Sequence, residues 1–163
     1  MAVRNRLIAR SVEDVWAVLA DATLYGDWVV GTSESRPAEG EWPQVGSSIT
    51  YTVRLGWWSV SGRTVVRRCE APGVLELEAD SGRLGTARIA VEIRPWGEDA
   101  LVIIDEHPLR GPAGFLHNSV ADALIQLRHR SMLARLADVV EKTAARTREP
   151  LRQRAQLRPE SPR

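Results

Sequence analysis

The chain has 163 residues, the length of one domain, and a chain of this length can bury well over half of the surface that its unfolded form exposes. Hydrophobic residues make up 44% and charged residues 26%, which argues against both a disordered chain and a membrane protein. The net charge is +1, and the single cysteine, Cys69, excludes an internal disulfide and favours a cytoplasmic location.

Neither a membrane span nor a signal peptide is expected. The longest apolar runs, such as "VWAVLA", are far shorter than the roughly 20 residues that cross a bilayer. The start of the chain, "MAVRNRLIARSVED", lacks the apolar core and small-residue cleavage site of a signal peptide.

The charge is unevenly distributed along the chain. Residues 146–163 contain six arginines and two glutamates, a balance of +4, which leaves −3 for residues 1–145 by subtraction from the total of +1. Three prolines and few large apolar residues predict that this tail is unpacked. We therefore divide the chain into a folded domain, 1–145, and a basic tail, 146–163. The tail has no interleaved aromatic residues or recognition module, so we expect a solubilising tail and no nucleic-acid partner.

The first part of the chain predicts a strand followed by two short helices. "VRNRLIA" alternates as a strand does, and Ser11 then opens "SVED", a capping box that begins a helix. Asp21 offers a second cap for a short helical turn through "ATLYGDW". The apolar stripe of the first helix consists of Val12, Val15, Trp16 and Leu19.

The middle of the chain has the period of two that is typical of strands. "ITYTVRL", "VLELEA" and "TARIAVEIRP" alternate apolar and polar residues, and the connections "EAPG", "DSGRLG" and "PWGED" are too short for crossover helices. The sheet is therefore expected to be antiparallel, with one apolar face. From about Val120 to Arg146 no glycine or proline occurs, which predicts a long helix that covers this face. The predicted fold is α+β, with a curved antiparallel sheet of about seven strands wrapped round a long C-terminal helix.

Four segments carry a resemblance to a known family: "VWAVLADATLYGDWV", "PQVGSSI", "EHPLRGP" and "LRHRSMLARLADVVE". Together with the order of elements, they resemble the START-like helix-grip superfamily, specifically the bacterial polyketide cyclase/dehydrase (SRPBCC) family, over residues 3 to about 142. The resemblance implies a deep, mostly apolar cavity between sheet and long helix that holds lipids, polyketides or similar molecules. Some members catalyse aldol cyclisation or dehydration and many only bind or carry, so the resemblance does not choose between these activities.

Aromatic residues are the candidates for an apolar ligand site. The chain has six tryptophans and one phenylalanine, and Trp28, Trp57, Trp58 and Tyr51 are placed in the lining of the cavity. Because neighbours on a strand face opposite sides, only one of Trp57 and Trp58 can point inward. The remaining tryptophans are given structural roles: Trp16 in the core, and Trp42 and Trp96 as caps over the end of the sheet.

The segment "LVIIDEHPLRGP" carries three ionisable residues at the end of an apolar strand. If Glu106 faces the cavity, desolvation would raise its pKa and allow proton transfer near neutral pH. If the register is reversed, Asp105 and His107 line the cavity, and His107 is the natural base. Both faces of the strand begin apolar, so the pattern leaves the two alternatives open.

A second polar cluster lies near the start of the last helix. Glu106, His117 and Arg128 could converge at one end of a cavity and bind the polar end of a ligand. The catalytic candidates are Glu106, His107 and His117. In the structural alternatives, Glu106 pairs with an arginine such as Arg67 or Arg88, and His117 caps the helix.

Three functions remain open at this point. The leading one is binding or carriage of a small apolar molecule, the second is a polyketide cyclase or dehydratase, and the third is a module that contacts a protein or a membrane through the basic tail. No nucleophile-elbow, zincin, dinucleotide or Walker motif occurs, and the three histidines match no metal pattern, so no metal or other cofactor is expected. The oligomeric state stays open.

Overall fold

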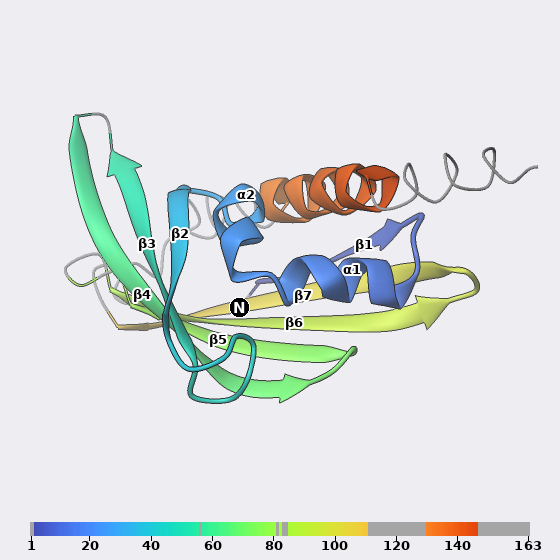
Figure 1. Cartoon of the computed structure of the whole chain (residues 1–163), viewed down its shortest axis with the longest axis horizontal. Helices are drawn as coiled ribbons and strands as arrows, with labels where there is room; N and C mark the ends of the chain where they lie inside the picture. The colour runs from blue at the N-terminus through green and yellow to red at the C-terminus, as the bar shows by residue number, and fades with distance from the viewer. Residues whose placement is uncertain (1, 56, 81, 83–84, 111–129, 147–163) are drawn as a thin grey trace, which may run out of the picture.

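A computed structural model describes residues 2–55, 57–80, 82, 85–110 and 130–146. Within these ranges seven strands form one antiparallel sheet in the order β1-β7-β6-β5-β4-β3-β2, so that the first and last strands of the chain are neighbours (Figure 1). The strands are β1 (Ala2–Ile8), β2 (Thr32–Glu39), β3 (Ser48–Leu55), β4 (Trp58–Glu70), β5 (Val74–Asp80), β6 (Thr86–Trp96) and β7 (Asp99–Arg110).

Three short helical segments follow β1: α1 (Val12–Leu19), η1 (Ala22–Leu24) and α2 (Tyr25–Trp28). Both predicted caps are confirmed. The Ser11 hydroxyl accepts a hydrogen bond from the Asp14 amide at 3.2 Å, and an Asp21 carboxylate oxygen accepts one from the Thr23 amide at 2.9 Å. Each cap satisfies an amide that has no partner within its own helix.

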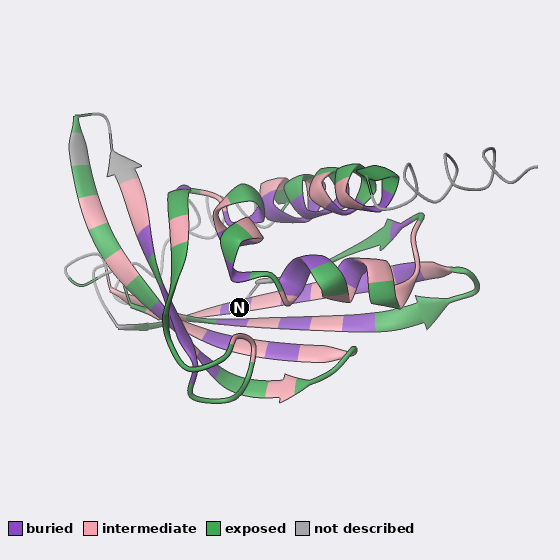
Figure 2. Ribbon diagram, in the orientation of Figure 1, coloured by how far each residue is buried: buried purple, intermediate pink, exposed green. Residues whose placement is uncertain are grey.

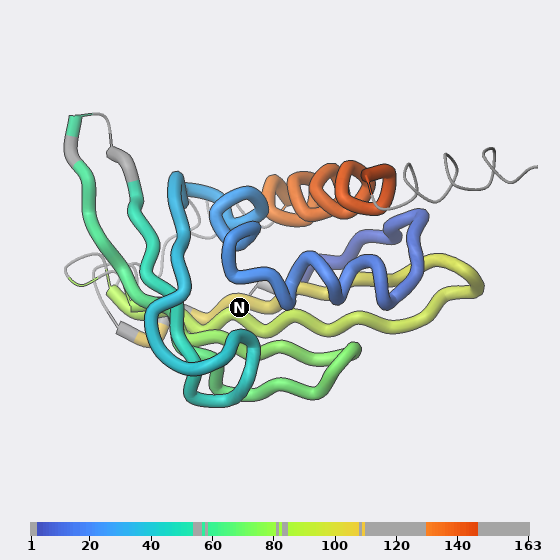
Figure 3. The backbone as a smooth tube through the Cα atoms, viewed as in Figure 1, coloured from blue at the N-terminus to red at the C-terminus, as the bar shows by residue number. Residues whose placement is uncertain are grey.

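The long C-terminal helix is described over residues 130–146, and the predicted first turns, residues 120–129, lie outside the described residues. It lies on the same side of the sheet as α1 and α2, and strands β2 to β4 curl toward that side (Figures 1 and 3). The predicted α+β arrangement of a curved sheet around a long helix is therefore confirmed.

The side of the sheet that faces the helices, here called the inner face, contains most of the core. The period-two prediction holds along β6, where Ile89, Val91 and Ile93 are buried and the intervening residues are more exposed (Figure 2). One apolar cluster joins the sheet to the helices. Its members include Val15, Val18, Ile49, Val66, Leu75, Leu77, Val102, Ile104, Met132, Leu136 and Val140.

The opposite side, here called the outer face, is covered by ion pairs between neighbouring strands. Arg67 binds Glu78 at 3.0 Å, and Arg88 binds Glu76. Arg67 and Arg88 therefore pair with outer-face glutamates, and the structural alternative in which one of them pairs with Glu106 is wrong. Such exposed pairs contribute at most about 1 kcal/mol each, so they keep the outer face hydrated more than they stabilise the fold.

The two tryptophans that were predicted to cap the sheet differ in their surroundings. Trp42 packs against the core, and its indole N–H donates to the carbonyl of Leu19 at 3.0 Å, which fastens the β2–β3 connection to the end of α1. Trp96, the last residue of β6, is 64% exposed, so the prediction for this residue is wrong. Trp16 packs against the core as predicted.

Candidate functional site

An aromatic cluster occupies the inner face beside α2. The ring of Tyr25 makes an edge contact with Trp28 at a centroid distance of 5.4 Å, and it lies 6.0 Å from Tyr51 and 6.3 Å from Trp42. Two predicted ligand residues, Trp28 and Tyr51, are thus brought together around a third ring. Trp28 is 1% exposed and Tyr51 is 5% exposed, so both rings are part of the buried core.

The cluster contains one buried polar contact. The hydroxyl groups of Tyr25 and Thr64 are 3.0 Å apart, and Thr64 is fully buried on β4. A buried hydroxyl without a partner would cost roughly 1 to 3 kcal/mol, so this hydrogen bond fixes how α2 sits on the sheet.

Tyr51 lies across the neighbouring strand. It is paired with Gly62 on β4, and a Cβ atom at Gly62 would lie 2.5 Å from the Tyr51 hydroxyl oxygen and 2.6 Å from its Cε2. The ring therefore occupies the space that any side chain at position 62 would need. Glycine at this position is what allows Tyr51 to lie flat against the inner face.

Glu106 faces inward from β7. It is 5% exposed and follows Val102 and Ile104 on the same side of the strand, and its pairing partner on β6 is the buried Ile89. Of the two alternatives for this strand, the structure has Glu106 on the inner face. A carboxyl group is thereby placed next to the apolar side chains of Ile89 and Ile104, where it could bind the polar end of a molecule or exchange a proton with it.

Asp105 and His107 point to the outer face. The Nε2 atom of His107 lies 2.9 Å from a carboxylate oxygen of Asp105, and both side chains are partly exposed. Their neighbours across the strands are Val3 on β1 and Arg88 on β6. The sheet itself separates this pair from Glu106, so His107 does not share a site with it.

Small side chains form a row beside Glu106 on the inner face. Ala87 on β6 is paired with Ala79 on β5, and Ala79 is paired with Thr64 on β4. Both alanines keep part of their surface exposed, while the larger side chains next to them on the same face, Leu77 and Ile89, are completely buried. These two small residues are therefore less covered than the larger side chains next to them.

The remaining predicted ligand residues are either exposed or outside the described residues. Trp57 is 93% exposed at the β3–β4 turn, away from the buried cluster. His117, Arg128 and the side chain of Trp58 lie outside the described residues. The structure thus places Glu106, Trp28 and Tyr51 on the inner side of the molecule and His107 and Trp57 elsewhere.

Sequence reasoning missed Tyr25 and Thr64. The spacing of Tyr25 and Trp28, three residues apart in a predicted helical turn, could have indicated a shared face. Nothing in the local pattern marks Thr64, because its partner is 39 residues away.

Thr64 and Glu106 are three strands apart, or roughly 14 Å along the sheet, so the two polar positions lie at different places on the inner face.

Two further properties of the described residues bear on function. They contain no group of three or more His, Cys, Asp or Glu side chains that could bind a metal ion. Among the helices of the same ranges, none combines the length and the apolar character needed to cross a membrane.

Fold and inner face together define an α+β protein of the helix-grip class. Residues 2–141 match the model of the family described as polyketide cyclase / dehydrase and lipid transport, and the chain belongs to this family. A comparison with curated proteins gives no match.

Solved structures show the same fold at low sequence identity. Protein CV1439 from Chromobacterium violaceum is 14% identical with a TM-score of 0.67, over 86% of this chain and 96% of that one. Ara h 8.0201 is 7% identical with a TM-score of 0.68, over 86% and 97% of the two chains. DynU16, a protein of the dynemicin biosynthetic locus, is 15% identical with a TM-score of 0.64, over 86% of this chain and 46% of that one.

Proposed function

We propose that the chain binds or carries a small apolar molecule on the inner face, between the sheet and the C-terminal helix. The observation that carries this proposal is the row of partly exposed small residues, Ala79 and Ala87, next to the inward-facing Glu106. Apolar surface that a ligand covers contributes roughly 25 cal/mol per Å², and the small side chains leave room for such contact.

The polar end of the ligand is assigned to Glu106, with His117 and Arg128 as further polar partners suggested by the sequence. The site lies next to the buried aromatic cluster that contains Trp28 and Tyr51. This division suits a molecule with an extended apolar part and one polar group, which is consistent with a family that includes lipid-transport proteins.

A pair of substitutions on one strand tests the proposal. Ala87→Trp places an indole on the inner face of β6, and Ala90→Trp places the same group on the outer face of the same strand. If a ligand binds over Ala87, the first variant loses displacement of the dye 1-anilinonaphthalene-8-sulfonate by oleic acid, whereas the second keeps it. If the inner face is already filled, Ala87→Trp is overpacked and is destabilised by about 1 to 3 kcal/mol instead. The proposal is contradicted if Ala87→Trp is destabilised in this way while oleic acid displaces the dye equally well from wild type, Ala87→Trp and Ala90→Trp.

A second candidate function is favoured by the buried carboxyl group of Glu106. A cyclase or dehydratase needs a proton donor or acceptor next to its substrate, and an inward-facing carboxyl group among apolar side chains suits that role.

The Glu106→Gln variant separates the two functions, because it keeps the shape of the side chain and removes its acid–base chemistry. Native mass spectrometry of protein purified from its own host identifies the bound molecule, and incubation with that molecule then measures turnover. An enzyme loses turnover by orders of magnitude in the variant, whereas a carrier shows no turnover in either protein and only a modest loss of affinity.

A further inference from the structure

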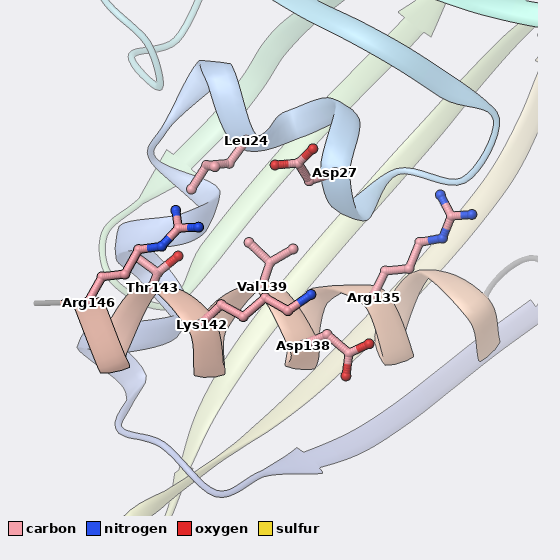
Figure 4. A pocket seen from close by; sticks show the side chains of 8 residues that line it. All are labelled: Leu24, Asp27, Arg135, Asp138, Val139, Lys142, Thr143 and Arg146. Carbon is pink, nitrogen blue, oxygen red and sulfur yellow. The ribbon is translucent and has the colours of Figure 1, made fainter.

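A groove between the C-terminal helix and the η1–α2 segment has a pronounced row of positive charge. It has a volume of about 370 Å³, and Arg135, Lys142 and Arg146 line it from the helix (Figure 4). The spacings of seven and four residues place the three cations on one side of the helix. All three side chains are exposed.

Two carboxylates lie in the same groove and offset part of this charge, which leaves the lining with a net charge of +1. Asp27 belongs to α2, and Asp138 lies at the edge of the helix stripe with its carboxylate directed away from the η1–α2 segment (Figure 4). The lining thus has three cations against two anions.

Two apolar side chains line the groove together with the charged ones. Leu24 comes from η1 and Val139 from the helix, and both are partly exposed although they pack against the core. A groove with cationic and apolar lining suits a molecule that has both apolar and anionic parts.

The length of the cationic row excludes a single small anion as its natural occupant. Arg135 and Arg146 are eleven residues apart, which corresponds to roughly 16 Å along the helix axis. One phosphate or carboxylate cannot contact both ends of such a row, whereas an array of anionic groups can. The basic tail does not complement the row in charge, because residues 147–163 carry five arginines against two glutamates.

We propose that this groove docks the protein on an anionic membrane surface, with lipid phosphate groups against the three cations and acyl-chain surface near Leu24 and Val139. Nucleic acid is a poorer match, because single strands are held by aromatic rings on which bases stack, and none of the described residues that line the groove is aromatic. The proposal adds a surface partner to the proposed ligand binding and does not depend on it.

The test measures co-flotation of the full-length protein with phosphatidylcholine vesicles with and without phosphatidylserine. Wild type is expected to prefer the anionic vesicles and to lose this preference at high salt. The triple variant Arg135→Gln/Lys142→Gln/Arg146→Gln is expected to bind them roughly 100-fold more weakly, because each basic residue near such a surface contributes about 1 kcal/mol and about 1.4 kcal/mol is tenfold.

A matched control and an opposite variant locate the effect. Arg67→Gln/Arg88→Gln/Arg94→Gln changes the net charge by the same amount on the outer face, and it is expected to weaken binding less than roughly threefold. Asp27→Asn removes a negative charge from the groove and should strengthen binding roughly fivefold. Circular dichroism verifies that each variant is folded.

Three results would overturn the proposal: no preference of wild type for anionic vesicles, equal losses in the two triple variants, or binding of DNA in place of vesicles through the same three residues. Because no apolar ligand is added, these results do not depend on the Ala87→Trp experiment. Failure of that experiment leaves the vesicle result intact.

Discussion

Replacement of Gly62 by alanine is expected to destabilise the protein, although alanine usually stabilises a strand relative to glycine. A Cβ at this position would lie 2.5 Å from the Tyr51 hydroxyl oxygen, and contacts below 3.0 Å do not occur with real Cβ atoms. The end of a tyrosine ring can often move aside. Here it cannot do so freely, because Tyr51 is 5% exposed and packs against Tyr25 at 6.0 Å.

The magnitude follows from two opposing effects. Inserting a methyl group into a packed site costs about 1 to 3 kcal/mol, and the better strand propensity of alanine returns about 0.5 to 1 kcal/mol. The net loss of unfolding free energy is thus about 1.2 kcal/mol from the midpoints, within limits of roughly 0 and 2.5 kcal/mol. For a chain of this length each kcal/mol lowers the melting temperature by roughly 2 to 4 °C, so differential scanning calorimetry and urea unfolding can both resolve the change.

Gly73→Ala is the matched control. The closest atoms to a Cβ there are carbonyl oxygens at 3.7 and 3.8 Å, which is ordinary contact, so this variant is expected to be neutral or slightly stabilised. In the double variant Gly62→Ala/Tyr51→Ala, the cost of the Gly62 substitution should largely disappear, because the ring that opposes the methyl group is gone. A Gly62→Ala protein as stable as wild type would refute this account of the Tyr51 ring.

Two further predictions concern buried groups. Tyr25→Phe should lower the unfolding free energy by roughly 1 to 2 kcal/mol, because it removes the hydrogen bond with the buried Thr64. A double-mutant cycle with Thr64→Val, measured by urea unfolding, should show a coupling energy of at least about 0.5 kcal/mol between the two residues. Additive losses in the two single variants would count against this hydrogen bond. Burial raises the pKa of the Cys69 thiol above its ordinary value of 9.0. At a pH below 9.0, Cys69 is therefore less often in the reactive thiolate form than a free peptide thiol is. Alkylation of Cys69 at pH 8 should therefore be slower than that of a free peptide thiol and should accelerate as the pH rises, and a rate equal to that of the free thiol would contradict this shift.

The fold could be predicted from the sequence because its main signals are local and repeated. The alternation in β6 placed Ile89, Val91 and Ile93 on one face, and these residues are buried as expected. The caps at Ser11 and Asp21 depend on atoms only two or three residues apart, which is why the sequence pattern alone could place them.

The site was harder to predict because it depends on pairings between distant strands. Tyr51 and Gly62 lie next to each other only through the register of β3 and β4, and Tyr25 meets Thr64 only after α2 has packed on the sheet. Strand geometry allows only one of Trp57 and Trp58 to point inward but does not say which, and Trp57 is 93% exposed in the β3–β4 turn.

The end of β7 explains why three ionisable residues follow an apolar run. Asp105 and His107 pair with each other on the outer face, whereas Glu106 points into the apolar interior. Because the sheet lies between them, Glu106 and His107 cannot act as acid and base on the same bound molecule. A catalytic mechanism at Glu106 therefore needs its second proton carrier from another element or from water, whereas a carrier needs none, and it would keep its function when Glu106 is replaced by glutamine.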